Sequence, residues 1–425
     1  MLSTIKSIAS LLLSYGLLLI ANGLLSTLLG VRTQIEGFET EIVGIIMGAY
    51  FLGLLLGARY SVRVVANVGH IRSFAAFASI MSISALAHVL IIDPIAWMVM
   101  RIVSGFCMAG MVMVTESWLH ERASNKTRGQ VLSLYMITNY AAAGCGQFLL
   151  PLADPARFHL FSVTSIVFSL ALVPVLLTRA AAPRPVEAHP INLRELYRVS
   201  PVGLVGSFCA GLVSSTFYGM GPIFTREIGL SLTGTSTFMA SVILGGLVLQ
   251  WPVGRLSDHV DRRWVLTGVT FAAAVACLAV VIVSTTRSSL GLYILGAVYG
   301  SLSFTLYSLS AAHTNDFADP DRLMQTASGL LIVYGVGAII GPMVAAAVMG
   351  QIGAGGMFLW SAFVLVALGG FAIWRIPKRA GKEESEKHRF VPVPATQYTS
   401  DQLYTAARDQ MDRDLANLIG GYRRR

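Results

Sequence analysis

One short charged stretch of this chain gathers several side chains that could do chemistry. The sequence GRLSDHVDRR, residues 254–263, carries three arginines, two aspartates and a histidine. It lies between the uncharged runs STFMASVILGGLVLQWPV and WVLTGVTFAAAVACLAVVIVS. The carboxylate of Asp258 can meet the positive N-terminal end of a neighbouring helix, and the arginines can reach lipid phosphates or acidic partners. The alternative is a loop that only orients a membrane protein, which would explain the arginines but not the glycine and aspartate.

Arg101 is the one basic residue that lies well inside an apolar run. A charged side chain at such a depth in a membrane is costly and usually faces a cavity or a partner. We therefore expect Arg101 to face a central cavity, where it would recognise an anion or take part in a proton relay. The alternative is a side chain that reaches the outer surface or is fixed to a backbone carbonyl.

The acidic residue closest to the interior of a run is Glu116, which lies about one turn from the inner end of its run. Proton coupling requires a group whose pKa changes with access to water, and Glu116 could serve. The alternative is a structural pair with Arg128 or another arginine on the same side. Glu116, Glu121 and Arg128 are therefore predicted to form a cytoplasmic charge cluster.

Several neutral polar and aromatic residues also lie inside apolar runs. Each one alone could make a helix–helix hydrogen bond as readily as a ligand contact. As a set they predict a mostly neutral, aromatic cavity, which suits an uncharged or weakly anionic small molecule. The predicted cavity residues are Asn22, Arg101, Asn139, Tyr140, Tyr218, Gln250, Tyr299 and Tyr334.

The sequence predicts no cofactor, no metal site and no enzyme. An enzyme would need a convergent nucleophile, base or metal cluster, whereas the eight histidines are dispersed. A channel would need a filter sequence or a ring of like charges, and the sequence shows neither. The four cysteines all fall inside apolar runs, as expected for reduced packing residues: Cys107, Cys145, Cys209 and Cys277.

These residues are set in a chain that is too apolar for a soluble fold. Of its 425 residues 55% are hydrophobic and 12% are charged, against about 25% charged in soluble domains. Runs of about 18 or more apolar residues indicate membrane-spanning helices, because lipid offers no partner to backbone polar groups. We predict an all-α integral membrane protein with twelve spans, at residues 8–30, 42–62, 74–92, 95–119, 129–152, 158–178, 201–225, 235–254, 264–285, 289–313, 325–350 and 355–375.

Basic residues collect in the loops on one side of these spans. The opposite loops carry only Arg32, Arg157, Arg226 and Arg287. Because positive loops stay in the cytoplasm, both termini are predicted to be cytoplasmic. The net charge of +9 is then largely a topology signal, and no nucleic-acid partner is predicted.

A polar connection with prolines and charges divides the spans into two halves of six. We predict an N-terminal six-helix bundle at 1–178, a cytoplasmic linker at 179–200, a C-terminal six-helix bundle at 201–377 and a cytoplasmic tail at 378–425. Two such halves around a midplane cavity are typical of transporters.

The tail contains the sequence SDQLYTAARDQMDRDLANLIGG, with an apolar residue at every fourth position. This pattern predicts a short amphipathic helix, which rests on the membrane surface or on the protein itself, or docks a partner. Because the spans complete the fold, removal of residues 390–425 is expected to leave transport intact.

The charged loop resembles the signature loop of the major facilitator superfamily. That pattern is glycine, three residues, aspartate, a basic residue, any residue, glycine and two basic residues. Gly254, Asp258, Arg262 and Arg263 are in register, and Asp261 stands where the pattern has glycine.

Other stretches strengthen the resemblance, which covers about residues 5–377. RIVSGFCMA matches a second pattern of the superfamily through Arg101, Gly105 and Ala109. GGLVLQWPVGRLSD, TESWL and LLIVYGVGAIIGP resemble the YcaD-type bacterial branch. Glycine pairs spaced by four in the second and eleventh spans favour close helix contact. These two helices slide at the domain interface in this superfamily, and the alternative is static packing. These pairs are Gly44–Gly48, Gly53–Gly57 and Gly337–Gly341.

The resemblance implies two pseudo-symmetric bundles that rock around a central site. Gly254, Asp258, Arg262 and Arg263 would form a cytoplasmic latch that is closed in the outward-open state. The predicted function is secondary active transport of a small molecule, coupled to an ion gradient such as protons, by a multi-pass monomer in a bacterial inner membrane. The alternative is a non-transporting membrane sensor or scaffold that signals through the tail.

Overall fold

The computed structural model describes residues 2–122, 128–177, 192–286, 288–319, 322–382, 384, 387 and 390. Within these ranges all regular structure is helical and no β-strand occurs. The predicted tail helix lies outside the described residues.

Six helices form an N-terminal bundle in which α1 packs against α5 and α6, and α4 packs against α2 and α3. Their bounds are α1 Leu2–Ile35, α2 Thr40–Val68, α3 His70–Leu90, α4 Pro94–Arg122, α5 Arg128–Gln147 and α6 His159–Leu176, with a 3-10 turn η1 at Leu150–Leu152.

The remaining helices form a C-terminal bundle in which α8 packs against α14, and α11 against α15. The short helix α7 lies in the predicted linker and is capped by Asn192, whose side chain accepts from the backbone N–H of Arg194. The bounds are α7 Leu193–Val199, α8 Pro201–Glu227, α9 Leu232–Gly245, α10 Gln250–His259, α11 Arg262–Thr285, α12 Ser289–Ser303, α13 Leu306–Asn315, α14 Leu323–Ile352 and α15 Gly356–Arg375, followed by a 3-10 turn η3 at Ile376–Lys378.

Two of the predicted spans are each divided into two helices. The eighth span breaks between Gly245 of α9 and Gln250 of α10, and the tenth breaks between Ser303 of α12 and Leu306 of α13. The periodicity of the sequence did not reveal these breaks, because apolar residues continue through them.

Eleven segments of the described residues are long and apolar enough to cross a membrane, which confirms a multi-pass helical protein. The predicted fifth span does not meet this criterion. It corresponds to α5, which ends at Gln147 rather than 152 and carries polar residues such as Asn139 along its length. α5 is less apolar than the other spans because part of its surface carries polar residues that make contacts inside the protein.

Glycines bring neighbouring helices into backbone contact. A Cβ on Gly53 of α2 would lie 2.0 Å from the carbonyl oxygen of Ile102 on α4, and one on Gly105 would lie 2.0 Å from that of Tyr50. Gly337 of α14 faces Phe208 of α8, with a Cβ-to-oxygen distance of 2.2 Å. Gly337 therefore packs α14 closely against α8 inside the C-terminal bundle.

The two bundles touch at the end of the molecule where α1, α8 and α14 terminate, which we call the closed end. A Cβ on Gly44 of α2 would lie 2.4 Å from the Cβ of Ala346 on α14. Gln34 of α1 donates from Nε2 to the carbonyl of Ile223 on α8, at 3.4 Å. Gly44 and its neighbours thus allow close contact between the bundles.

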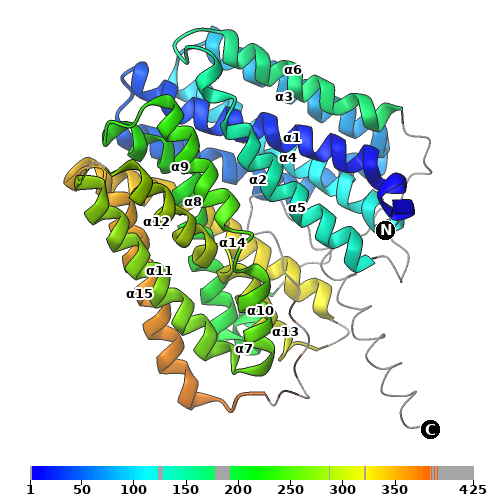
Figure 1. The fold of residues 1–425 in the computed structure, drawn as a ribbon. Helices are drawn as coiled ribbons and strands as arrows, with labels where there is room; N and C mark the ends of the chain where they lie inside the picture. Colours follow the sequence, from blue (N-terminus) through cyan, green and yellow to red (C-terminus); the bar gives the residue numbers. More distant parts are fainter. Residues whose placement is uncertain are drawn as a thin grey trace.

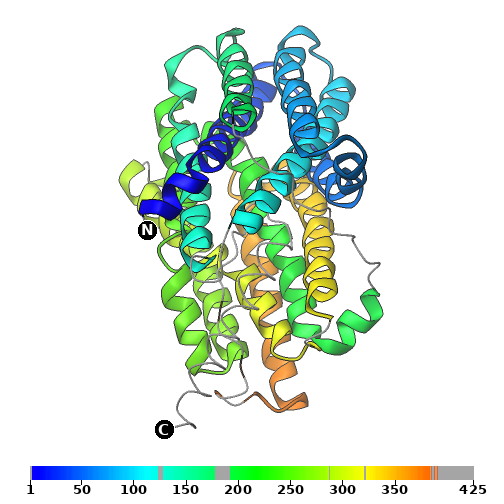
Figure 2. The same cartoon turned by 90° about the vertical axis from the view of Figure 1, so that its right-hand side faces the viewer.

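Away from this contact the bundles diverge toward the other end, which we call the open end. Figure 1 shows the ribbons separating toward the start of α5 and the end of α10. Figure 2 looks from that side and shows the N-terminal bundle above the C-terminal bundle. The loop of residues 254–263 lies at the open end.

Candidate functional site

A small pocket lies between the bundles, walled by α1 and α5 on one side and by α8 and α9 on the other. Its hydrogen-bonding side chains are neutral. The hydroxyls of Ser26 and Tyr218 are buried and have no hydrogen-bond partner within the described part of the chain. Groups of this kind are the ones a ligand would satisfy. The lining residues are Leu19, Asn22, Gly23, Ser26, Thr27, Ala143, Gln147, Tyr218, Met239 and Ile243.

Arg101 reaches this pocket indirectly. Its side chain is buried, with 2% of the residue's surface exposed, so it does not extend to the outer surface. Its Cζ lies 4.0 Å from the centre of the Tyr50 ring, and the Tyr50 hydroxyl donates to Oδ1 of Asn22 at 3.2 Å. Asn22 lines the pocket. Arg101 does not line it, but contacts Tyr50, which in turn donates to Asn22.

Glu116 lies in a chain of neutral hydrogen-bond donors rather than at the surface. Its fully buried carboxylate accepts from the hydroxyl of Tyr135, which in turn accepts from the hydroxyl of Tyr15 at 3.0 Å. The predicted cavity residue Asn139 donates to the Tyr15 hydroxyl. The two tyrosine rings stack with centres 4.7 Å apart. Residues of α1, α4 and α5 thus surround one acidic group.

The predicted charge cluster of Glu116, Glu121 and Arg128 stays a prediction. Glu121 is exposed on α4, and the side chain of Arg128 lies outside the described residues. Tyr15 and Tyr135 were not predicted from the sequence, because nothing near a tyrosine in an apolar run indicates which residue it will contact.

Tyr140 and Gln250 connect the two bundles at the helix breaks. Gln250 Nε2 lies 3.2 Å from the Tyr140 hydroxyl and 2.8 Å from the carbonyl oxygen of Phe304, to which it also donates. Phe304 lies in the break between α12 and α13, and its ring stacks on Tyr218 of the pocket wall at 5.7 Å. Gln250 therefore joins the breaks of both divided spans to α5.

Of the eight predicted cavity residues, only Asn22 and Tyr218 line this pocket, and Tyr299 and Tyr334 pack inside the C-terminal bundle. The ring of Tyr299 packs among Phe217 and Phe358 inside the C-terminal bundle, with centres 6.3 and 5.3 Å away. Tyr334 of α14 packs edge-on against Tyr307 at 5.2 Å. Neither lines the pocket described above.

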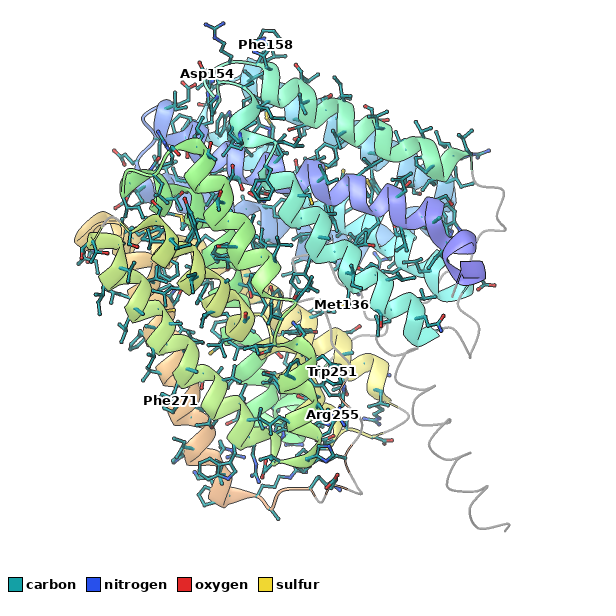
Figure 3. All side chains as sticks on the ribbon, in the orientation of Figure 1. Met136, Asp154, Phe158, Trp251, Arg255 and Phe271 are labelled. Atoms are coloured by element: carbon teal, nitrogen blue, oxygen red, sulfur yellow. The ribbon has the colours of Figure 1, made fainter. Side chains whose placement is uncertain are left out.

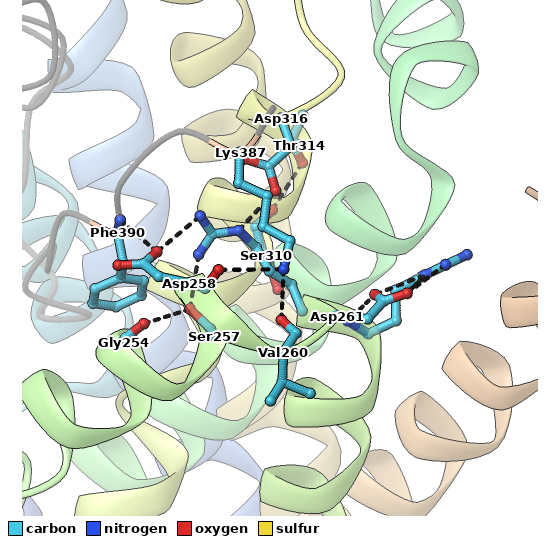
Figure 4. Close-up of polar contacts among 12 residues, drawn as sticks. Gly254, Ser257, Asp258, Val260, Asp261, Ser310, Thr314, Asp316, Lys387 and Phe390 are labelled. Carbon is cyan, nitrogen blue, oxygen red and sulfur yellow. Dashed lines mark hydrogen bonds and ion pairs between the residues drawn. The ribbon is translucent and has the colours of Figure 1, made fainter. Parts of the chain in front are cut away.

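Two of the three arginines of the signature loop, Arg262 and Arg263, are buried. Arg262 has 2% of its surface exposed and donates from Nε to Asp316 at 2.7 Å, from Nη1 to Ser257 at 2.7 Å and from Nη2 to Asp258 at 3.1 Å (Figure 4). Of the two expected partners, lipid phosphates or acidic groups, Arg262 has the second, because its charge is held between two carboxylates. Asp316, at the end of α13, was not singled out from the sequence.

Asp261, which replaces the glycine of the family pattern, is the N-cap of α11. Its carboxylate accepts from the backbone N–H of Arg263 at 3.0 Å and from Nη2 of the same residue at 2.6 Å. Burial raises the pKa of Asp261, but the hydrogen bonds and charge of Arg263 outweigh burial and leave that pKa below its usual value. The substitution therefore supplies a cap where the pattern has a flexible residue.

The exposed side of α10 carries the remaining arginine of the loop. The Cζ of Arg255 lies 5.3 Å from the centre of the Trp251 ring. Figure 3 shows both residues on α10 toward the open end, while Asp154 and Phe158 lie at the far side of the N-terminal bundle.

The sequence matches a known family over most of its length. The family model described as Major Facilitator Superfamily matches residues 11–331 and 203–408. The second match runs past residue 377, where the sequence resemblance was expected to end.

Curated relatives belong to the same family. The chain is 27% identical over 309 residues to the uncharacterized MFS-type transporter YcaD of Escherichia fergusonii, covering 72% of this chain and 79% of the relative. An uncharacterized MFS-type transporter of Enterobacter sp. (strain 638) is 29% identical over 310 residues, with the same coverage.

Solved structures share the fold at low sequence identity. A bacterial homolog of the human lysosomal transporter Spinster, inward-facing and occupied, has a TM-score of 0.73 and 14% identity, covering 91% of this chain and 98% of that one. The nucleoside transporter NupG has a TM-score of 0.70 and 13% identity, covering 86% and 98%. The family and its relatives are transporters, not enzymes. The helical fold, the signature loop and the sequence matches together place this chain in the major facilitator superfamily, as a membrane transporter of the YcaD type.

Proposed function

We propose that this chain transports a small, uncharged or weakly anionic molecule by rocker-switch alternating access. The observation that carries this proposal is the pocket between the bundles, in which the hydroxyls of Ser26 and Tyr218 are buried without partners in the described structure. Asn22 and Gln147 add amide groups to the same wall. A ligand with hydroxyl or amide groups would satisfy these atoms, whereas a polycation would meet no carboxylate in this lining.

The proposed topology places both termini in the cytoplasm and includes α5, which brings the number of spans to twelve. The basic loops on the side of residues 254–263 support the orientation. The packing of α1 and α9 against α5 supports its inclusion among the spans. The open end is then the cytoplasmic end, so that the pocket is reached from inside. The protein is proposed to be a monomer in the bacterial inner membrane.

Proton coupling is proposed to use Glu116. A carboxylate in a buried chain of tyrosine hydroxyls can be held protonated or charged according to which side admits water. Tyr135, Tyr15 and Asn139 extend from it across α5 and α1. Asn139 is followed in the chain by Tyr140, which contacts Gln250 of the other bundle. A change of protonation at Glu116 can therefore affect the contact between the bundles.

The test begins with a thermal-shift screen of the purified protein against metabolites and drugs, followed by uptake of each hit into proteoliposomes. Tyr218→Phe removes the unpartnered hydroxyl of the pocket and is expected to raise the concentration needed for half-maximal uptake. Tyr299→Phe removes the same atom from the core of the C-terminal bundle and is the matched control.

Equal effects of the two tyrosine variants would contradict the assignment of the pocket. If a hit shifts the melting temperature but crosses no membrane under any gradient, the protein is better described as a sensor or scaffold.

A further inference from the structure

The chain that follows the last helix returns to the signature loop. Lys387 donates from Nζ to the backbone carbonyls of Asp258 and Val260, at 3.3 and 2.9 Å (Figure 4). The backbone N–H of Phe390 donates to Oδ1 of Asp258 at 2.9 Å. The carboxylate of Asp258 thus accepts both from Arg262 and from the tail.

The same segment is fixed at two further points. Arg263 donates from Nη1 to the carbonyls of Ile376 and Arg379, at 3.1 and 2.7 Å. Glu384 lies with Oε1 2.6 Å from Nδ1 of His259. These contacts bring the chain directly from the end of α15 to the loop.

Gly254 forms the seat for Phe390. Only 8% of the surface of Phe390 is exposed, and a Cβ on Gly254 would lie 2.1 Å from Cδ1 of its ring. The space beside Gly254 of the signature pattern is therefore filled by the aromatic ring of Phe390, and any larger residue at position 254 would displace this ring.

Phe390 covers a face of α10 that continues toward the other bundle. Gln250, Gly254 and Asp258 are spaced by four residues and so lie along one side of the helix. Gln250, the first residue of α10, contacts Tyr140 of α5. If the bundles closed at the open end, α5 would approach this side of α10 where Phe390 now lies.

We propose that Glu384, Lys387 and Phe390 form a tail contact, an internal ligand of the signature loop that must leave before the open end can close. The tail would then set the rate at which the transporter leaves the state described here. This regulatory role rests on the proposed alternating access, whereas the contact itself does not. It also revises the expectation that removal of residues 390–425 leaves transport unchanged, because that deletion removes Phe390.

The contact is tested by cross-linking two cysteines in the full-length protein. His259 and Glu384 meet at the ends of their side chains, with Nδ1 2.6 Å from Oε1, so cysteines at these positions are expected to be joined by a short bifunctional thiol reagent rather than by a direct disulfide, which needs Cα atoms within about 7 Å. The exposed Cys145 is replaced by serine in this background. Gly254→Leu should abolish the cross-link by filling the seat of Phe390. Gly268→Leu is the control, since nothing lies within 4 Å of a Cβ at that position. Equal yields in these two variants would overturn the tail contact.

The regulatory role is tested with spin labels at Asn67 and Arg322, which are exposed at the open ends of α2 and α14. Phe390→Ala is expected to shift their distance distribution to shorter values. Phe158→Ala, an exposed aromatic at the far side, should leave the distribution unchanged.

If both phenylalanine variants behave alike while the cross-link forms, the tail binds the loop but does not hold the end open, and the regulatory proposal fails. If the cross-link forms and no variant transports any screened compound, the tail contact stands and the proposed function fails.

Discussion

Replacement of Gly44 by alanine should shift the protein away from the state described here. The new Cβ would lie 2.4 Å from the Cβ of Ala346 and 2.8 Å from the carbonyl oxygen of Pro342. Carbon atoms in contact prefer about 3.5–4.0 Å, so α2 and α14 would have to separate by about 1 Å at the closed end.

The size of the shift follows from where the clash exists. Overpacking costs about 1–3 kcal/mol, and in an alternating-access cycle the cost applies only while α2 and α14 touch. The gain in helix propensity from glycine to alanine, about 1 kcal/mol, is present in both states and cancels. A difference of about 1–3 kcal/mol changes the ratio of the two states about 5- to 150-fold.

The assay is a pair of distance measurements by spin labelling. Labels at the exposed residues Glu39 and Gln351 report the closed end and should gain a longer-distance population in Gly44→Ala. Labels at Asn67 and Arg322 report the open end and should gain a shorter one.

Two glycine variants serve as controls. Gly268→Ala meets no atom within 4 Å and should leave both distances unchanged. Gly53→Ala clashes with Ile102 inside one bundle, so it should lower the melting temperature without favouring either state. The reasoning is refuted if Gly44→Ala lowers the melting temperature as Gly53→Ala does while the distances at both ends stay as in the wild type.

Three further outcomes are expected. Arg101→Leu removes a cation–π contact with Tyr50 worth about 0.5–2 kcal/mol and should lower uptake about 2- to 30-fold without loss of insertion, with Arg101→Lys intermediate because lysine lacks the planar guanidinium; wild-type uptake by the leucine variant would contradict this role. Glu116→Gln should keep exchange down a substrate gradient but lose accumulation driven by a pH gradient, whereas Glu121→Gln should retain both in the same liposomes. Because its pKa is lowered in the folded protein, Asp261 stabilises the fold above its unfolded pKa of about 3.9 and this contribution is lost as pH falls through the lower folded value; the melting temperature of Asp261→Asn should therefore depend less on pH below about 5, and an unchanged pH dependence would count against the cap.

Local patterns of residues were enough to predict the class of protein. Long apolar runs, loops of basic residues and the spaced Gly254, Asp258, Arg262 and Arg263 are all local patterns, and local patterns predicted the helical membrane fold and the family that the comparisons confirm. Arg101 was recognisable for the same reason, because a charge in an apolar run stands out whatever its partner is.

The tertiary structure alone decided the partners. Arg101 contacts Tyr50, 51 positions earlier, and Tyr15 of the Glu116 chain lies 120 positions from Tyr135. A tyrosine among apolar residues looks the same in a core, at a pocket wall or beside a carboxylate, since its neighbours depend on how the helices rotate and pack. Asp258 shows the same limit most clearly: its type and place were evident from the sequence, but only the returning chain brings the N–H of Phe390 to its carboxylate, because a hydrogen bond requires proximity in space and not along the chain.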